Sequence, residues 1–262
     1  QVHALAVDAT SGTVLLADAH GHPLSPALMY NDGRAVEEAR ALTPHAPRNS
    51  AAHGTASGLA KLLWLQQHTD TTQVRHALHH ADWIVGRLCG RYDITDANNA
   101  LKTGYDAQVK RWPAWLHAVG LRTEWLPRVI APGARIGTIT LQAALELGLP
   151  PATHIIAGTS DSTAAIIATG AHAVGDAVTS LGSTLVVKVI SAQPVFAPEY
   201  GVYSQPLGKL WLVGGGSNSG GAVLRSFFND AQMAAMTPRV NPEIFTGLDY
   251  YPLLAPGERF PL

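Results

Sequence analysis

The chain has very little cysteine and no long apolar run. Its 262 residues include a single cysteine, Cys89, which excludes an intrachain disulfide and predicts a reducing, cytoplasmic location. No apolar stretch reaches the roughly 18 residues that a membrane span needs, and no signal-peptide pattern is evident. Charged residues make up 14% of the chain and the formal net charge is −1. Neither nucleic acid nor an anionic membrane is therefore an expected partner.

Signatures of metal sites and of serine hydrolases are also weak. His76, His79 and His80 fall in a segment expected to be helical, where positions 76 and 80 would share a face. No further histidine or carboxylate follows at ligand spacing, so we predict no metal site formed by side chains. The Gly-x-Ser-x-Gly elbow is absent, which argues against a hydrolase that uses Ser160 or Ser183.

Apolar residues, in contrast, make up 47% of the chain, which indicates one large folded domain or two medium ones. The patterns predict both strands and helices along the chain. Expected strands are 2–8, 13–18, 24–30, 155–157, 200–204 and 210–213; expected helices are 34–42, 59–67, 74–89, 112–119, 140–147 and 161–169.

One acid stands at a junction between a strand and a helix. The segment 155–165 predicts a short strand, a tight turn at Gly158 and the first turn of a helix, with Asp161 where the helix begins. Ligands of open α/β sheets bind outside the carboxyl ends of the strands, and a carboxylate there can act as a general base. Asp161 could equally cap the helix, because Asp is a preferred N-cap residue.

A second polar turn follows about twenty residues later. The segment 177–190 predicts two strands joined by Gly182, Ser183 and Thr184. Backbone amides and hydroxyls in such a turn can bind phosphate. An ordinary hairpin turn is the alternative.

Together, Gly-Thr-Ser-Asp-Ser at 158–162 and Thr-Ser-Leu-Gly-Ser-Thr at 179–184 resemble the central region of the FGGY carbohydrate kinases. The resemblance implies an α/β, ribonuclease-H-like or actin-like ATPase fold with two domains flanking a cleft. It implies that Asp161 is the general base toward a sugar hydroxyl, that Gly182, Ser183 and Thr184 form a phosphate loop, and that ATP and Mg²⁺ are the cofactors. Residues 1–158 would belong to the sugar-binding domain and 159–262 to the start of the ATP-binding domain.

The resemblance also suggests residues on each side of the reaction. The turn at 8–13 can hydrogen-bond a polyol, although its residues are also ordinary turn formers. Tyr-Asn-Asp-Gly-Arg at 30–34 resembles a family signature with Trp in the first position, and Thr-Asp-x-x-x-Ala at 95–100 resembles an element beside the sugar site or, alternatively, a capped short helix. The expected sugar-binding residues are Asp8, Thr10, Ser11, Asp32 and Ser162. The Gly-rich segment 214–222, expected to be a loop before a helix, contributes Gly215 and Asn218 to the nucleotide side.

The resemblance covers nearly the whole chain and is strongest to plant and cyanobacterial ribulose-kinase-like proteins. The family's opening Asp-x-Gly-Thr hairpin and its late adenosine loop have no counterpart in the sequence, so we expect an internal piece of a longer kinase. The expected activity is ATP-dependent phosphorylation of a ketopentose, D-ribulose before D-xylulose. The alternative is a catalytically inactive sugar- or nucleotide-binding protein of the same fold. The oligomeric state is open, with a homodimer among the options.

Overall fold

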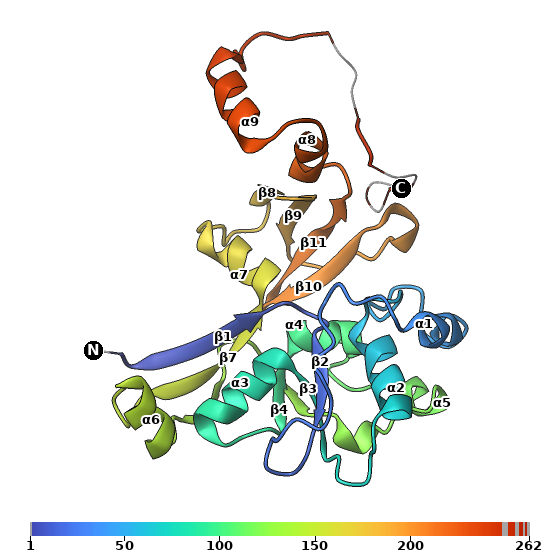
Figure 1. Ribbon diagram of the computed structural model, residues 1–262, viewed down its shortest axis with the longest axis vertical. Helices are drawn as coiled ribbons and strands as arrows, with labels where there is room; N and C mark the ends of the chain where they lie inside the picture. Colours follow the sequence, from blue (N-terminus) through green and yellow to red (C-terminus); the bar gives the residue numbers. More distant parts are fainter. Residues whose placement is uncertain (1, 248–250, 255–256, 259, 261–262) are drawn as a thin grey trace. The chain divides into compact units, whose positions relative to one another are not determined.

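The computed structural model describes residues 2–247, 251–254, 257–258 and 260. Its backbone contacts divide the chain into two compact units (Figure 1). The first comprises Gln1–Gly170 and Gln205–Lys209, and the second comprises Ala171–Ser204 and Leu210–Leu262. The first segment of this unit therefore ends at Gly170, twelve residues after the expected domain boundary at Gly158, and the helix that follows residue 160 belongs to the first unit. The expected boundary stays a prediction.

The first unit is built around a three-stranded sheet in the order β1-β7-β6. In it β1 (Ala4–Ala9) pairs in parallel with β7 (His154–Ser160), which pairs antiparallel with β6 (Arg135–Thr138). Two short pairs accompany it: antiparallel β2 (Val14–Ala17) with β3 (His76–His79), and parallel β4 (Ile94–Asp96) with β5 (Arg128–Ile130). The helices are α1 (Val36–Leu42), α2 (Gly58–His68), α3 (His80–Cys89), α4 (Ala97–Ala100), α5 (Trp115–Ala118), α6 (Leu141–Leu147) and α7 (Asp161–Ala168).

Capping residues and apolar packing explain these helices. The α2 helix begins because the Ser57 hydroxyl accepts the amide of Ala60 at 3.1 Å, and the buried side chains of Leu59, Leu62 and Leu65 pack in the core cluster that also contains residues of β2. A second cluster surrounds Ile155 of β7 and includes residues of α3, β4, β6 and α6. The predicted helix 140–147 is confirmed, and it ends at the left-handed Gly148 as expected.

Three expected elements differ in the structure. Residues 24–30 do not form a strand, although the Leu24 amide donates to the Leu16 carbonyl at 2.8 Å and Leu28 forms an isolated bridge with Val14. Between these contacts the Ser25 hydroxyl accepts the Leu16 amide at 2.9 Å, and Pro26 has no amide to donate to a strand ladder. The expected helix 74–89 is a strand followed by a helix, since the carboxylate of Asp82 accepts the amide of His79 at 3.0 Å and starts α3 at His80. The helix expected over 112–119 is only the four residues of α5.

The second unit contains the four-stranded sheet β10-β11-β9-β8, except that Gln205–Leu207 of β10 belong to the first unit. Its elements are β8 (Ala177–Leu181), β9 (Leu185–Ser191), β10 (Tyr203–Leu207), β11 (Leu210–Ser217), α8 (Gly221–Phe227) and α9 (Asp230–Met236). The glycines at 214–216, expected to begin a loop, pair with residues 186–188 as the end of β11. A Cβ at Gly214 would lie 1.9 Å from the carbonyl of Val187, so glycine here permits close strand approach. Within the described part of the chain, no helix combines the length and the apolar character needed to cross a bilayer.

Candidate functional site

The carboxyl ends of β1 and β7 meet at one edge of the first unit's sheet. The strands run in parallel (Figure 1). Their register pairs Asp8 with Thr159 and Ala9 with Ser160. Strand β7 carries one extra residue there, because the pairing advances from Ile156 to Thr159 while β1 advances only from Ala6 to Asp8. The predicted polar turn after the first strand and the predicted acid after the seventh are therefore neighbours along this edge.

Gly158 occupies the resulting irregularity instead of the tight turn that the sequence suggested. A Cβ at this position would lie 1.8 Å from the carbonyl oxygen of Val7, so the two strands can approach only around glycine. The strand continues beyond it to Ser160. Because a β-bulge redirects the side chains that follow it, this irregularity aims the residues at the start of α7.

Asp161 is the first residue of α7, and the N-cap position belongs to Ser160. The structure thus corrects the alternative in which Asp161 is the cap. The Asp161 side chain is exposed, and its Oδ1 accepts the amide of Ser162 at 2.7 Å. Ser160 is buried, and its hydroxyl lies 3.0 Å from that of Thr163. The carboxylate is therefore oriented by its own helix turn and remains open to solvent.

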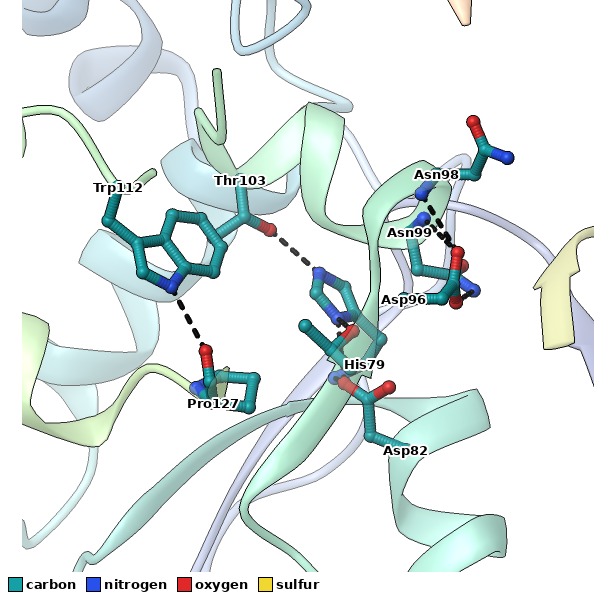
Figure 2. Close-up of polar contacts among 9 residues, drawn as sticks. His79, Asp82, Asp96, Asn98, Asn99, Thr103, Trp112 and Pro127 are labelled. Carbon is teal, nitrogen blue, oxygen red and sulfur yellow. Dashed lines mark hydrogen bonds and ion pairs between the residues drawn. The ribbon is translucent and has the colours of Figure 1, made fainter. Parts of the chain in front are cut away.

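The short helix α4 lies against the end of β7. Asp96 caps it, since Oδ1 accepts the amides of Asn98 and Asn99 at 2.8 and 3.1 Å (Figure 2). The side-chain amide of Asn98 donates to the hydroxyl of Thr159 at 2.9 Å. Asp96 is buried, and burial raises the pKa of its carboxyl group. The capped-helix alternative for this motif is confirmed; Asn98 was not singled out from sequence, and only its place within the 95–100 motif pointed to it.

A buried histidine network supports the same region. Nδ1 of His79 lies 2.7 Å from Oδ2 of Asp82 and 3.0 Å from the hydroxyl of Thr95, and Nε2 lies 2.9 Å from the hydroxyl of Thr103 (Figure 2). The carboxylate favours the proton on Nδ1, so in the neutral ring Nε2 accepts from Thr103. Both ring nitrogens are therefore used in tying β3, α3, β4 and residues 101–103 together.

The metal pair considered from sequence does not form on one helix. His76 lies in β3, whereas His80 begins α3. Among the described residues, no group of three or more His, Cys, Asp or Glu side chains is placed to hold a metal ion.

The turns at 10–13 and 29–32 extend from the same end of an antiparallel bridge between Val14 and Leu28. In the first turn the hydroxyl of Thr10 lies 2.9 Å from that of Thr13. In the second, Arg34 donates from Nε to both carboxylate oxygens of Asp32, at 2.9 and 3.0 Å. The hydrogen bonds from Arg34 lower the pKa of Asp32. The segments that hold the expected Asp32 and the expected Thr10 and Ser11 therefore both adjoin this bridge.

In the second unit the turn at 182–184 rests on the start of α8. The amides of Gly221 and Ala222 donate to the carbonyls of Gly182 and Ser183 at 2.7 and 3.2 Å. A Cβ at Gly220 would lie 2.6 Å from the Ser183 carbonyl. Gly220 therefore allows the 182–184 turn to pack against the start of α8. The amides of Gly221 and Ala222 bond to this turn and do not face solvent.

The two other expected nucleotide-side residues contact later parts of the chain. Asn218 donates its amide to Glu258 Oε1 at 2.7 Å and its side-chain amide to the Gly257 carbonyl at 3.2 Å. Gly215 makes room for Phe260, whose ring carbon would lie 2.6 Å from an added Cβ. A role for either residue toward a nucleotide stays a prediction.

Solved sugar kinases share this fold. The gluconate kinase from Lactobacillus acidophilus is 22% identical, with a TM-score of 0.79, and the match covers 91% of this chain and 51% of that one. The xylulose kinase from Rhodospirillum rubrum is 23% identical, with a TM-score of 0.76, covering 88% and 51%. The predicted α/β, actin-like ATPase fold class is confirmed.

Sequence comparison then defines the family. Residues 1–168 match the sequence model of the FGGY family of carbohydrate kinases, N-terminal domain, and the chain belongs to this family. It is 32% identical over 187 residues to the xylulose kinase of Streptomyces rubiginosus, covering 64% of this chain and 36% of the relative. It is 26% identical over 212 residues to the xylulose kinase of Escherichia coli K12, covering 78% and 43%. The chain thus spans about two fifths of these curated relatives.

Proposed function

We propose that the chain carries the sugar site and part of the ATP site of an ATP-dependent ketopentose kinase that prefers D-ribulose to D-xylulose. Family membership supports a carbohydrate kinase, and the relatives named xylulose kinase and L-fuculokinase are sugar kinases by name. The preference for D-ribulose rests on the pattern Asp-x-Thr-x-x-Thr at 8–13, which resembles the ribulokinase branch of the family more than the xylulokinase branch.

Asp161 is the proposed general base. Phosphoryl transfer asks the protein chiefly for positioning, charge stabilisation and one acceptor for the proton of the nucleophile. The observation that carries the assignment is an exposed carboxylate at the carboxyl end of β7, oriented by the Ser162 amide at 2.7 Å. A carboxylate has about four acceptor sites, so one amide donor leaves capacity for a sugar hydroxyl.

The sugar would be held by the polar residues that surround the ends of β1 and β7. Asp8 shares the strand register with Thr159, and the Thr10 and Ser11 turn follows directly. Asp32 lies on the neighbouring turn and Ser162 beside the base. Carboxylate and hydroxyl groups match the donors and acceptors of a polyol.

On the nucleotide side, Gly182, Ser183 and Thr184 would hold phosphate oxygens of ATP. The backbone of Gly220 packs so closely against the Ser183 carbonyl that only glycine fits there, and this packing supports a fixed shape for the turn. Bound ATP with Mg²⁺ supplies the phosphoryl group, and Mg²⁺ keeps most of its water ligands in such sites. Gly215 and Asn218 would complete this side.

The test is ADP release by the whole protein with ATP and Mg²⁺ against D-ribulose, D-xylulose, L-ribulose and glycerol. We expect one pentulose to be strongly preferred. Asp161→Asn should lower kcat by about 10²–10⁴-fold, the usual contribution of a general base, with an unchanged melting temperature. The matched variant Asp8→Asn should mainly raise KM, because it would remove ground-state binding.

Near-normal turnover of Asp161→Asn would overturn the base assignment. Pentulose binding by calorimetry without ADP release in the wild type would instead favour a catalytically inactive sugar-binding protein.

A further inference from the structure

Lys61 is an ammonium group buried inside the first unit. It lies in α2 between the core residues Leu59 and Leu62, and its exposed fraction is 0%. Burying a charged group is unfavourable unless a hydrogen-bond partner compensates. Here Nζ donates to the main-chain carbonyl of Met29 at 2.7 Å. A residue this unfavourable to bury, at a position that an apolar side chain could fill, calls for a role beyond packing.

The Met29 carbonyl is the acceptor that closes the turn carrying Asp32. It also accepts the amide of Asp32 at 3.0 Å. The side chains of Met29 and Tyr30 are 49% and 46% exposed, so burial of the turn's own side chains does little to hold it. The ammonium of Lys61 is thus the group that fixes this turn to a helix.

A second contact from the same helix holds the other end of the turn. Arg34, which binds both carboxylate oxygens of Asp32, places its guanidinium carbon 5.0 Å from the ring centre of Trp64. Trp64 is three residues after Lys61 in α2, and residues at this spacing are neighbours on a helix surface. The helix therefore contacts the turn on both sides of Asp32, through one hydrogen bond and one cation–π contact.

Two charged residues act on Lys61: Asp32 in the 29–32 turn, and Lys102 in the one-turn helix 101–103. Burial, and after it the charge of Lys102, lowers the pKa of Lys61 to about 8, and the carboxylate of Asp32 opposes this shift. Nζ of Lys102 in turn lies 3.5 Å from the carbonyl of Ser11. Lys61 therefore contacts the 29–32 turn directly, whereas Lys102 contacts the 10–13 turn.

We propose that Lys61 is a positioning residue for sugar binding: its buried ammonium fixes the Met29–Asp32 turn and so presents Asp32 to the sugar without contacting the sugar itself. The proposal rests on the proposed function, because it takes Asp32 as a sugar-binding residue. Its structural part, the hold on the turn, can be measured in the absence of any sugar.

The experiment compares the whole wild-type protein with Lys61→Met, which keeps the length of the side chain but removes the donor. Three quantities are measured: amide hydrogen exchange at Asp32 and Arg34 without sugar, the dissociation constant for D-ribulose and D-xylulose by calorimetry, and the melting temperature. Lys110→Met, at an exposed turn lysine, is the matched control.

We expect Lys61→Met to exchange the Asp32 amide about tenfold faster or more, and to bind the preferred pentulose about tenfold more weakly, as expected for the loss of one charged hydrogen bond. Its melting temperature should stay equal or rise, because a buried charge is gone. A lysine with a merely structural role would lower it. Lys110→Met should change none of the three.

Unchanged exchange at Asp32 overturns the proposal, and so does faster exchange with an unchanged dissociation constant. If the wild type binds neither pentulose, the proposed function is overturned, and with it the role of Lys61 in sugar binding. The exchange data then show separately whether the turn depends on Lys61.

If Lys61→Met does not fold, Trp64→Leu replaces it. That variant removes the contact with Arg34 and should raise exchange and weaken binding in the same way, whereas an unchanged dissociation constant overturns the proposal.

Discussion

The side-chain amide of Asn98 donates to the hydroxyl oxygen of Thr159 at 2.9 Å and to the carbonyl of Pro206 at 3.0 Å. These bonds join α4 to β7 two residues before Asp161, at positions where Asn98 and Thr159 are 1% and 7% exposed. The end of the strand that leads to the proposed base is therefore held by a residue from a distant part of the chain.

Asn98→Ala should destabilise the protein by about 1–3 kcal/mol, because two buried acceptors lose their donor. Asn98→Asp should be worse, since a carboxylate would face the Pro206 carbonyl. Urea unfolding measures both. The control Gln142→Ala, at an exposed helix position, should stay within about 0.5 kcal/mol. Equal stability of Asn98→Ala and wild type would contradict the role of these hydrogen bonds.

Gly158→Ala should prevent folding or cost more than about 4 kcal/mol, an exceptional value for one methyl group. The added Cβ would lie 1.8 Å from the main-chain oxygen of Val7, and backbone cannot move aside as a side chain can. Gly137→Ala on the adjacent strand β6 is the control, because its Cβ would meet Cys89 at an ordinary 3.8 Å. Comparable melting temperatures for the two variants would contradict the close approach of β1 and β7.

Lys188 should make the stability of the second unit depend on pH. Its side chain is 3% exposed, its Nζ lies 3.6 Å from the ring centre of Tyr203, and it has no hydrogen-bond acceptor among the described residues. Burial lowers its pKa from 10.5 to about 7. Between these values the unfolded chain binds more protons than the folded one, so this group makes the free energy of unfolding rise with pH from about 7 to 10.5.

Lys188→Met should remove that slope and raise stability near pH 6.5, where the wild type buries a charge. Urea unfolding at pH 6.5, 8 and 9.5 checks this as the difference between variant and wild type. Lys209→Met, at an exposed lysine, should leave the slope unchanged. A constant difference between Lys188→Met and wild type across this range would contradict the lowered pKa.

Asp82→Ala should destabilise the first unit by about 3–5 kcal/mol, the range for removing one member of a buried pair. The carboxylate starts α3 by accepting the His79 amide at 3.0 Å, and its Oδ2 also lies 2.7 Å from the His79 ring. Asp106→Ala is the control, because Asp106 accepts amides only in a surface turn. Similar losses in the two variants, measured by chemical denaturation, would show that the buried network contributes little.

Local sequence was sufficient where neighbouring residues decide the structure. The helix 140–147 was predicted with its left-handed glycine end, because a hydroxyl cap and a following Gly148 act within one or two turns. The acid at the junction of a strand and a helix was recognisable in the same way, and the motif around it indicated the family that the comparison confirmed. Its role as a base stays a prediction.

Features that depend on distant partners could not be predicted. Whether Gly158 forms a turn or a bulge depends on how closely Val7 approaches it from a strand about 150 residues earlier. The histidines at 76–80 divide between a strand and a helix because β2 pairs with the first part, although the pattern is also helical. Nothing in the local sequence marks Lys61 and Lys188 as buried, and only packing buries them.

By itself, then, the sequence determined the family through its motifs. It also determined the strand-to-helix junction that presents Asp161 and most helix ends, because these depend on contacts between residues close along the chain. Tertiary structure alone decided which strand ends meet, which glycines allow backbones to touch, and which charged groups lose their water. Those outcomes depend on pairing and burial between segments far apart in the sequence, and residue types do not specify such pairing.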